Sequence, residues 1–412
     1  MSPTTGQGAT HSVSRADQVE VADIFRIYGQ RYRSNHRLPL SHLKVMRAIE
    51  SCRTAALGGH VEKCDHCGFE RISYNSCRNR HCPKCQAMAK AAWLQQRKAE
   101  LLPVGYFHNV FTLPHELNSI AQANKEVVFN LLFKSAADTL QEFAADPTHG
   151  LGGRLGLTAI LHTWDQKLNS HIHLHCVIPG GALLKNNTQW IHAKDNFLFP
   201  VKALSRVFRG KFIDFLDQAF NNGLLIFPGK AAVFKTIQGF GLLLNQLWKK
   251  EWVVYSKKPF AGPEKVLDYL GRYTHRVAIS NHRIVSVKNS MATFSYQDRS
   301  DENKVKHLTI KAEEFIRRFM MHVLPKSYVR IRYFGFLANK CKKKNLACCQ
   351  QALHYHLQPS EPVEITARAM MLYLTGEDLN RCPHCKIGTM YISMQLPKTP
   401  LIRFQPAEID SS

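Results

Sequence analysis

The run HIHLHCVIPGG at residues 171–181 alternates histidines with apolar residues, and this alternation limits what the chain can form there. In a β-strand, successive side chains point to opposite faces. The histidines would therefore share one face, while the residues between them lie against a core. Imidazoles about 6–7 Å apart along such a row can share one metal ion. The run thus indicates either a metal site or a histidine-rich surface strand, and its histidines are His171, His173 and His175.

The sequence around this run predicts further strands and helices. The apolar run 156–164 ends just before the histidine strand, so the two are expected to pair as a hairpin. Helical spacing of apolar residues and helix-stop signals predict the helices. Strands are expected at 106–114, 277–280, 283–287 and 292–296, and helices at 41–52, 90–102, 129–143 and 262–276. The chain after about residue 305 is expected to be mostly helical and strongly basic.

Two C-x-x-C pairs separated by fourteen residues predict a zinc site. Each pair places two thiolates on one tight turn, which suits a tetrahedral ion. The first predicted site uses both pairs: Cys64, Cys67, Cys82 and Cys85. A possible second site uses the remaining residues of the block: Cys52, His60, Cys77 and His81. Arg78 and Arg80 make the loop between the pairs cationic, which is typical of nucleic-acid binding, although zinc can also be purely structural.

A further C-x-x-C pair lies near the C-terminus, at Cys382 and Cys385. Together with Cys341 and Cys348 it would supply four thiols for another metal site. Neighbouring thiols can equally be buried without a metal. We expect the cysteines to be ligands or buried thiols rather than disulfides, because the sequence indicates a reducing cytosol.

The charge of the chain favours a polyanionic partner. Lys and Arg number 55 against 31 Asp and Glu, which gives a formal net charge of +24. Such a balance is typical of proteins that bind nucleic acid, and the run Lys342, Lys343 and Lys344 is one expected contact surface. No stretch of eighteen uncharged apolar residues and no signal-peptide pattern occurs, so we expect a soluble intracellular protein.

The predicted helix 262–276 places Tyr269 and Tyr273 side by side, one turn apart. They lie between an apolar stripe and a flank that contains Arg272 and Arg276. Two tyrosines at the edge of a core are usually packing residues. Here, neighbouring cations would favour the phenolate and hold a phosphodiester in front of it. Attack by the phenolate would leave a 5′-phosphotyrosine link and a 3′-hydroxyl. Rejoining would then need no ATP, and the sequence has no G-x-x-x-x-G-K-[ST] loop.

Four motifs together resemble the rolling-circle, two-tyrosine transposases of bacterial insertion sequences. This is the insertion-sequence-ninety-one-like group of the HUH nuclease superfamily. The motifs are HTWDQKLNSHIHLHCVIPGG, YLGRYTHRVAISNHR, GGHVEKCDHC with NSCRNRHCPKCQ, and FIRRFMMHVLPKSYVRIRYFG. Ile172, where proline is common, and Asp165, where glycine is common, depart from the pattern, but neither is an expected ligand or nucleophile.

The resemblance implies an α+β fold, in which a small zinc-binding domain precedes a ferredoxin-like nuclease domain with an antiparallel sheet. It also implies Mg²⁺ or Mn²⁺ bound by His173 and His175, and nucleophiles at Tyr269 and Tyr273. The third metal ligand stays open among His171, His162 and Gln166.

These observations predict a polar segment at 1–40, a zinc-binding domain at 41–102, a nuclease domain at 103–300, a basic helical region at 301–386 and a tail at 387–412. The expected function is nicking and rejoining of single-stranded DNA at transposon ends and in target DNA, in the bacterial cytoplasm. Alternatives are a plasmid relaxase or rolling-circle replication initiator, a non-catalytic zinc-dependent DNA-binding protein, and a zinc hydrolase. The absence of an H-E-x-x-H motif disfavours the hydrolase.

Overall fold

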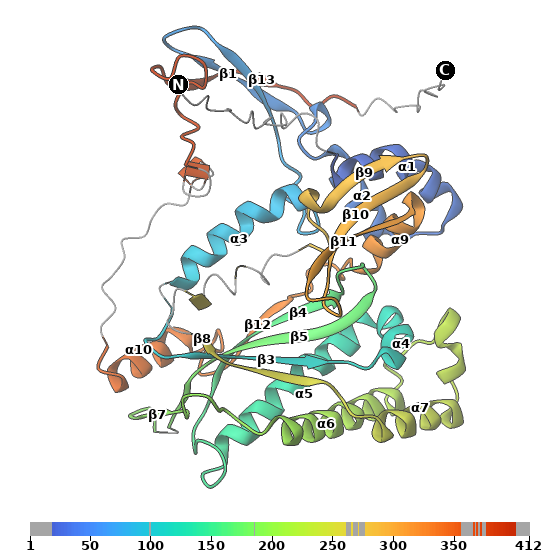
Figure 1. The fold of residues 1–412 in the computed structure, drawn as a ribbon, viewed down its shortest axis with the longest axis vertical. Helices are drawn as coiled ribbons and strands as arrows, with labels where there is room; N and C mark the ends of the chain where they lie inside the picture. The colour runs from blue at the N-terminus through green and yellow to red at the C-terminus, as the bar shows by residue number, and fades with distance from the viewer. Residues whose placement is uncertain are drawn as a thin grey trace, which may run out of the picture.

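The computed structural model describes most of the chain between residues 19 and 400 (Figure 1). The described ranges are 19–98, 100–184, 186–260, 265–266, 271, 277–355, 366, 368–369, 371–372 and 376–400. Within these ranges, no helix is both long enough and apolar enough to span a membrane. The architecture is α+β with antiparallel sheets, as expected from the sequence.

A five-stranded antiparallel sheet has the histidine strand as its middle strand. The strand order is β12-β4-β5-β3-β8. The strands are β3 (Tyr106–Thr112), β4 (Gly156–Trp164), β5 (Ser170–Pro179), β8 (Val254–Phe260) and β12 (Ile331–Gly335). The predicted hairpin of β4 and β5 is confirmed, because His162 lies opposite His173 in their ladder. The histidines therefore lie on the strand with the most neighbours on either side.

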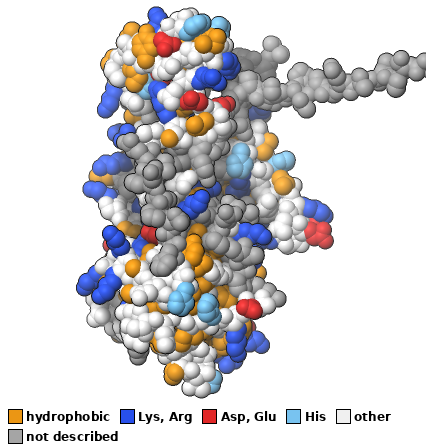
Figure 2. Space-filling view, turned by 90° about the vertical axis from the view of Figure 1, so that its left-hand side faces the viewer, with side chains coloured by type: hydrophobic (Ala, Val, Ile, Leu, Met, Phe, Trp, Pro, Cys, Tyr) orange, Lys and Arg blue, Asp and Glu red, His pale blue; other side chains and the backbone are white. Residues whose placement is uncertain are grey.

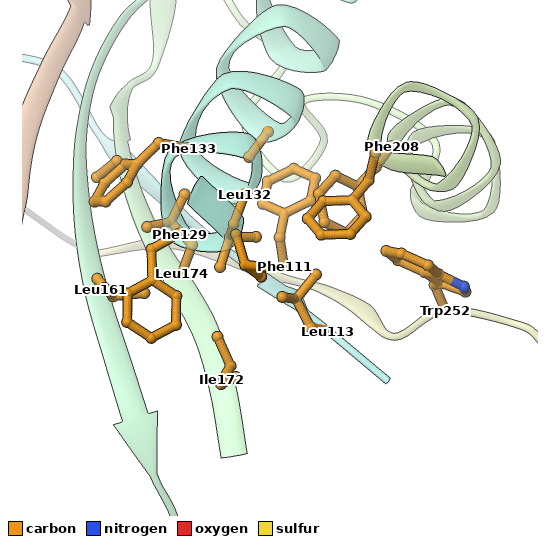
Figure 3. Close-up of a cluster of buried hydrophobic side chains, with 14 of the residues drawn as sticks. Phe111, Leu113, Phe129, Leu132, Phe133, Leu161, Ile172, Leu174, Phe208 and Trp252 are labelled. Carbon is orange, nitrogen blue, oxygen red and sulfur yellow. The ribbon is translucent and has the colours of Figure 1, made fainter. Parts of the chain in front are cut away.

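Helices α5 (Lys125–Ala145), α6 (Val201–Asn221) and α7 (Ile237–Lys249) cover one face of this sheet (Figure 1). Figure 3 shows strand residues such as Leu161 and Leu174 meeting Phe129 of α5. All three side chains are at most 1% exposed. Burying one such side chain contributes about 1.5–3 kcal/mol, so this face fixes β5 firmly in the sheet. The histidines lie on the other face.

The remaining elements around this sheet are short. They are α4 (Asn118–Ala123), the hairpin of β6 (Gly181–Leu183) and β7 (Trp190–His192), and α10 (Lys342–Ala352). Four short 3-10 helices complete the described connections: Ala55–Leu57, His115–Leu117, Gly229–Phe234 and Asn281–Arg283.

A second core joins the start of the chain to its later part. It contains α1 (Val21–Asn35) and α2 (Leu40–Ser51), which pack with α9 (Ala312–Met321) and the sheet β11-β10-β9. The three strands are β9 (Ile284–Lys288), β10 (Met291–Asp298) and β11 (Lys304–Lys311). The ring centroids of Phe25 and Phe319 are 5.3 Å apart, edge to face. Residues nearly 300 positions apart thus share one core.

A third sheet has the order β13-β1-β2 and lies at one end of the molecule (Figure 1). Its strands are β1 (Gly59–Cys64), β2 (Glu70–Tyr74) and β13 (Met390–Leu396), and α3 (Pro83–Lys98) follows β2 in the chain. The C-terminal strand β13 therefore belongs to the same sheet as the first two strands of the protein.

The structure corrects three expectations about organisation. The segment 1–40 is not merely polar, because α1 buries Val21, Ile24 and Phe25 at helical spacing. The region 301–386 is not mainly helical, because it supplies β11 and β12 to two sheets. Residues 277–280 are not a strand, whereas β9 and β10 form where strands were expected. The helical spacing in α1 was visible in the sequence, whereas β11 and β12 form because long-range packing decides which elements complete a sheet.

Candidate active site and metal centres

The histidine face of β5 carries a cluster of three imidazoles. His173 and His175 come from β5, and His162 lies opposite His173 on β4. One ring nitrogen from each of the three lies within 4.8 Å of the others. All three residues are buried. The alternation predicted from the sequence is present, because Ile172 and Leu174 point into the core instead.

Hydrogen bonds orient the two β5 histidines. The Nδ1 atom of His173 lies 2.8 Å from the carbonyl oxygen of His171, and the Nδ1 atom of His175 lies 2.9 Å from Nε2 of His108. In metalloproteins, a ligating histidine normally uses its second ring nitrogen in this way. The Nε2 atom of each β5 histidine is then the nitrogen that can take a metal.

Burial keeps His173 and the neighbouring His108 neutral. Desolvation lowers the pKa of His173 to about 3. Desolvation, followed by the charge of Lys257, also lowers the pKa of His108 to about 3. Charging an imidazole in such surroundings is unfavourable. A neutral imidazole keeps the lone pair that a metal needs.

The structure separates the three candidates for the third metal ligand. His162 is part of the imidazole cluster. His171 is exposed and lies outside the ligand group, although its ring centroid is 4.7 Å from that of His173. The carbonyl oxygen of Gln166 accepts a hydrogen bond from Arg283 in a neighbouring loop. The geometry therefore favours His162.

Sequence reasoning missed His108 of β3. Its strand, YFHNVFT, alternates in the same way as β5, so His108 was predictable as the residue facing away from Phe107. What the sequence lacked was the register, in which His108 lies opposite Val177 and Val110 opposite His175. That register places His108 on the histidine face.

Tyr269, Tyr273, Arg272 and Arg276 lie outside the described residues. Two residues near them in the chain, Val266 and Gly271, are described. Val266 is fully buried in a cluster with Ile160 and Val177, which share the sheet face of the histidines. Gly271 approaches α3, since a Cβ atom added there would lie 3.0 Å from Cδ1 of Leu94. Val266 thus packs on the histidine side of the sheet, and Gly271 lies beside α3.

Two groups of four cysteines form, and they differ from the expected grouping. One group unites Cys52, Cys77, Cys82 and Cys85, and the other unites Cys64, Cys67, Cys382 and Cys385. The two internal C-x-x-C pairs are therefore in different sites. The reason is that the first pair follows β1, whereas the second begins α3, and each meets a different partner segment.

The two histidines expected in a second zinc site have other surroundings. Nε2 of His60 lies 3.7 Å from Oε1 of Glu62 on the same strand. His81 is half-buried, and desolvation lowers its pKa to about 3. Neither is in a cysteine group. Cys341 and Cys348 are also outside both groups.

The first cysteine group has the dimensions of a zinc tetrathiolate. The Sγ atom of Cys85 lies 3.6 Å from Sγ of both Cys52 and Cys77. Zinc–sulfur bonds of about 2.3 Å at tetrahedral angles would set sulfur atoms about 3.8 Å apart. A hydrogen bond with Cys77 lowers the pKa of the Cys52 thiol to about 7. A thiol that ionises readily is suited to metal ligation.

The expected DNA-binding residues fall into two classes. Arg80 donates hydrogen bonds to the carbonyl oxygens of Pro325 and Tyr328, so it fastens two segments together. Lys342 is also engaged within the protein: its Nζ lies 3.0 Å from Oε2 of Glu100. The exposed members of the set are Arg78, Lys343 and Lys344. Lys and Arg side chains are spread over the face drawn in Figure 2, where acidic side chains are fewer.

Comparisons with known proteins agree with this arrangement. A family model described as a transposase zinc-binding domain matches residues 24–113, and a model described as a putative transposase matches residues 156–345. A putative transposase of Sinorhizobium fredii, y4qJ, is 50% identical over 376 residues, which are 90% of this chain and 94% of that protein. The chain belongs to the insertion-sequence-ninety-one-like transposases.

A second relative of the transposase is more distant. The transposase for insertion sequence element IS801 of Pseudomonas savastanoi pv. phaseolicola is 28% identical over 345 residues, which are 83% of this chain and 81% of that protein. No solved structure matches the chain. The zinc-binding match includes the group of Cys52, and the transposase match includes β4 and β5. Cys382 and Cys385 lie outside both matches.

Proposed function

We propose that this transposase nicks and rejoins single-stranded DNA at the ends of its insertion sequence through 5′-phosphotyrosine links, which drive rolling-circle-like transposition. The observation that carries the proposal is the cluster of His162, His173 and His175 on the sheet face against which Val266 packs. Val266 lies only three residues before Tyr269 in the chain. A residue that packs beside the histidines therefore stands close in sequence to a candidate nucleophile.

The three imidazoles fit a divalent metal ion. They converge from two adjacent strands, and hydrogen bonds hold Nδ1 of His173 and of His175. A bound Mn²⁺ or Mg²⁺ would polarise the non-bridging oxygens of the scissile phosphate. Mg²⁺ prefers oxygen ligands and Mn²⁺ accepts nitrogen more readily, so we expect Mn²⁺ to support cleavage at lower concentration.

The chemistry assigned to the protein is nucleophilic substitution at phosphorus. The hydroxyl oxygen of Tyr269 or Tyr273 loses its proton and bonds to phosphorus, while the bond from phosphorus to the 3′-oxygen breaks and that oxygen leaves as a 3′-hydroxyl. A 3′-hydroxyl attacks the link in the reverse step and restores the phenol. The number of phosphodiester-type bonds is unchanged, so neither step requires ATP. Two nucleophiles allow one tyrosine to keep a 5′ end while the other attacks a second strand.

The partners proposed for this reaction are single-stranded DNA at the element ends and target DNA, on the nucleoid in the bacterial cytoplasm. The net charge of +24 supports a polyanionic partner, and Arg78, Lys343 and Lys344 are exposed for contact with it. Arg272 and Arg276 are proposed to hold the scissile phosphate beside the tyrosines.

Covalent capture of DNA tests the proposal. Purified protein is incubated with Mn²⁺ and end-labelled single-stranded oligonucleotides that carry the element ends, and adducts are separated under denaturing conditions. We expect an adduct with the label on the 5′-phosphate fragment, and none when Tyr269→Phe and Tyr273→Phe are combined. Tyr391→Phe, at an exposed tyrosine of β13, is the matched control and should form the adduct normally. An adduct in the double variant would refute the assigned nucleophiles.

A further inference from the structure

The second cysteine group joins residues that are more than 300 positions apart in the chain. Cys64 ends strand β1 and Cys67 follows it, and Cys382 and Cys385 precede strand β13. The Sγ atoms of Cys64 and Cys385 are 3.7 Å apart, and so are those of Cys67 and Cys382. These distances match the separation of about 3.8 Å that a zinc ion imposes on its thiolates.

The two C-x-x-C segments form the same kind of turn. In the first, the amide of Gly68 donates to the carbonyl of Cys64 over 3.2 Å, and Gly68 has left-handed backbone with a φ of +71°. In the second, the amide of Lys386 donates to the carbonyl of Cys382 over 3.1 Å, and Lys386 has a φ of +60°. A lysine rarely adopts this left-handed conformation. Two matched turns that face each other are the arrangement of paired zinc knuckles.

Amide groups also point at the sulfur atoms. The amide of Cys67 lies 3.4 Å from Sγ of Cys64, and the amide of Gly388 lies 3.4 Å from Sγ of Cys385. Amide hydrogen bonds favour the thiolate, which is the form that binds metal.

We propose that Cys64, Cys67, Cys382 and Cys385 bind one zinc ion that fastens the C-terminal segment onto the N-terminal zinc-binding domain. The matched zinc-binding domain ends at residue 113, so half of the ligands of this site come from outside it. The transposase then carries two structural zinc ions. The ligands of one come from the N-terminal part alone, and the other links that part to the C-terminal segment.

Other contacts lay the C-terminal segment along β1 in the same place. β13 pairs antiparallel with β1, from Leu396 opposite Gly59 to Met390 opposite Cys64. Nη2 of Arg368 lies 2.6 Å from Oε1 of Glu62, whose side chain is only 4% exposed. These contacts bring the two knuckles together, and the zinc ion joins them. The module is complete only once residues 382–396 have been synthesised.

Zinc content of the full-length protein tests the proposal. Wild-type protein should contain two zinc ions per chain. The double variant Cys382→Ser/Cys385→Ser should contain one, and Cys64→Ser/Cys67→Ser should also contain one. Combining all four changes should remove no further zinc, because both pairs belong to the same site. Two zinc ions in the Cys382→Ser/Cys385→Ser variant would overturn the proposal, as would loss of both from the combined variant that retains its fold.

Further variants separate ligation from misfolding. Cys385→His replaces one zinc ligand by another and should restore a zinc content of two. Cys341→Ser/Cys348→Ser alters cysteines outside the group and should leave two zinc ions in place. Cys385→Ala offers no ligand atom, so two zinc ions in that variant would exclude a ligand role for Cys385. None of these measurements depends on DNA cleavage, so they stand apart from the proposed reaction.

The fastening role has its own test. A specific protease sequence is inserted after residue 360, and the cut protein is passed over a sizing column with and without a zinc chelator. The C-terminal fragment should co-elute with the rest of the protein in zinc buffer and separate from it in chelator. Co-elution that persists in chelator would show that strand pairing alone holds the C-terminal fragment. Separation in zinc buffer would show that neither zinc nor strand pairing holds it. Either result would refute the fastening role.

Discussion

His108 of β3 lies directly beside His175 of β5, with its Nε2 atom 2.9 Å from Nδ1 of His175. Their ring planes are 16° apart and their centroids 5.1 Å apart. His108 is only 3% exposed and is not itself in the imidazole cluster. We infer that it is a positioning residue, whose Nε2 accepts a hydrogen bond from Nδ1–H of His175 and so leaves Nε2 of that ring free to bind a metal.

Replacing His108 should weaken metal binding rather than remove it. His108→Phe keeps a ring but removes the nitrogen that meets His175, so we expect the half-saturating Mn²⁺ concentration for cleavage to rise about 10–100-fold. His108→Gln retains an acceptor and should recover part of the loss. The measurement is cleavage against Mn²⁺ concentration, together with direct Mn²⁺ titration by calorimetry. An unchanged half-saturating concentration in His108→Phe would exclude the positioning role.

Removing a histidine that binds the metal should reduce cleavage more than removing His108, which only positions such a histidine. His162→Ala or His173→Ala removes one of the three imidazoles, and we expect cleavage to fall below detection while DNA binding is retained. His171→Ala is the matched control, since His171 is on the same strand but exposed and outside the cluster. Cleavage and mobility-shift assays are run on the same preparations. A variant that loses both activities together would point to a folding role, and inactivity of His171→Ala would make His171 a ligand.

Buried histidines should also make stability depend on pH. Burial lowers the pKa of His322 to about 4, where Thr163 and the carbonyl of Leu168 bond its two nitrogens. Between this pKa and the usual value of about 6.5, the unfolded chain takes up a proton that the folded protein does not. The stability is therefore complete above about pH 6.5 and is lost as the pH falls toward 4.

The expected loss for this one group is about 2 kcal/mol between pH 7.5 and pH 5. Urea unfolding at both pH values measures it. His322→Gln cannot take up the proton, so its stability should differ less between the two conditions. His149→Gln, at a largely exposed histidine, should behave as wild type. An equal pH dependence in wild type and His322→Gln would contradict the assignment.

The sequence predicted those features that are local in the chain. The alternation in β5 and the short turn before it determine both the hairpin with β4 and the face on which the histidines lie. Helix α5 was expected for the same reason, from apolar residues at helical spacing. Such periodicity is visible in a single segment because one face of each element is buried.

The grouping of the cysteines could not be predicted in this way. Two C-x-x-C pairs and two single cysteines in one block suggest that these cysteines bind together, yet Cys64 and Cys67 meet Cys382 and Cys385 instead. This grouping depends on the pairing of β1 with β13, a contact between segments more than 300 positions apart in the chain. His108 could not be predicted for the same reason, because its role depends on the register between β3 and β5. A local pattern shows on which face of a strand a residue lies, but not which residue lies opposite it on the neighbouring strand.

The three adjacent lysines 342–344 differ in exposure and pairing, and this difference gives a further prediction. Lys343 and Lys344 are exposed, whereas Lys342 is paired with Glu100 and lies 3.9 Å from the ring centroid of Tyr333. If the exposed pair contacts DNA phosphates, each contact adds about −0.7 to the slope of log affinity against log salt for single strands. Lys343→Ala/Lys344→Ala should therefore reduce the steepness of that slope by about 1.4.

Lys342→Ala is the matched control for this pair. It should leave the salt slope unchanged and instead lower the melting temperature, because it removes an ion pair that is mostly buried. Fluorescence anisotropy with a labelled single strand, across a series of KCl concentrations, measures the slope for all three proteins. If the double variant keeps the wild-type slope, this lysine run is not part of the DNA-binding surface. If Lys342→Ala alone flattens the slope, the buried lysine reaches DNA after a rearrangement of α10.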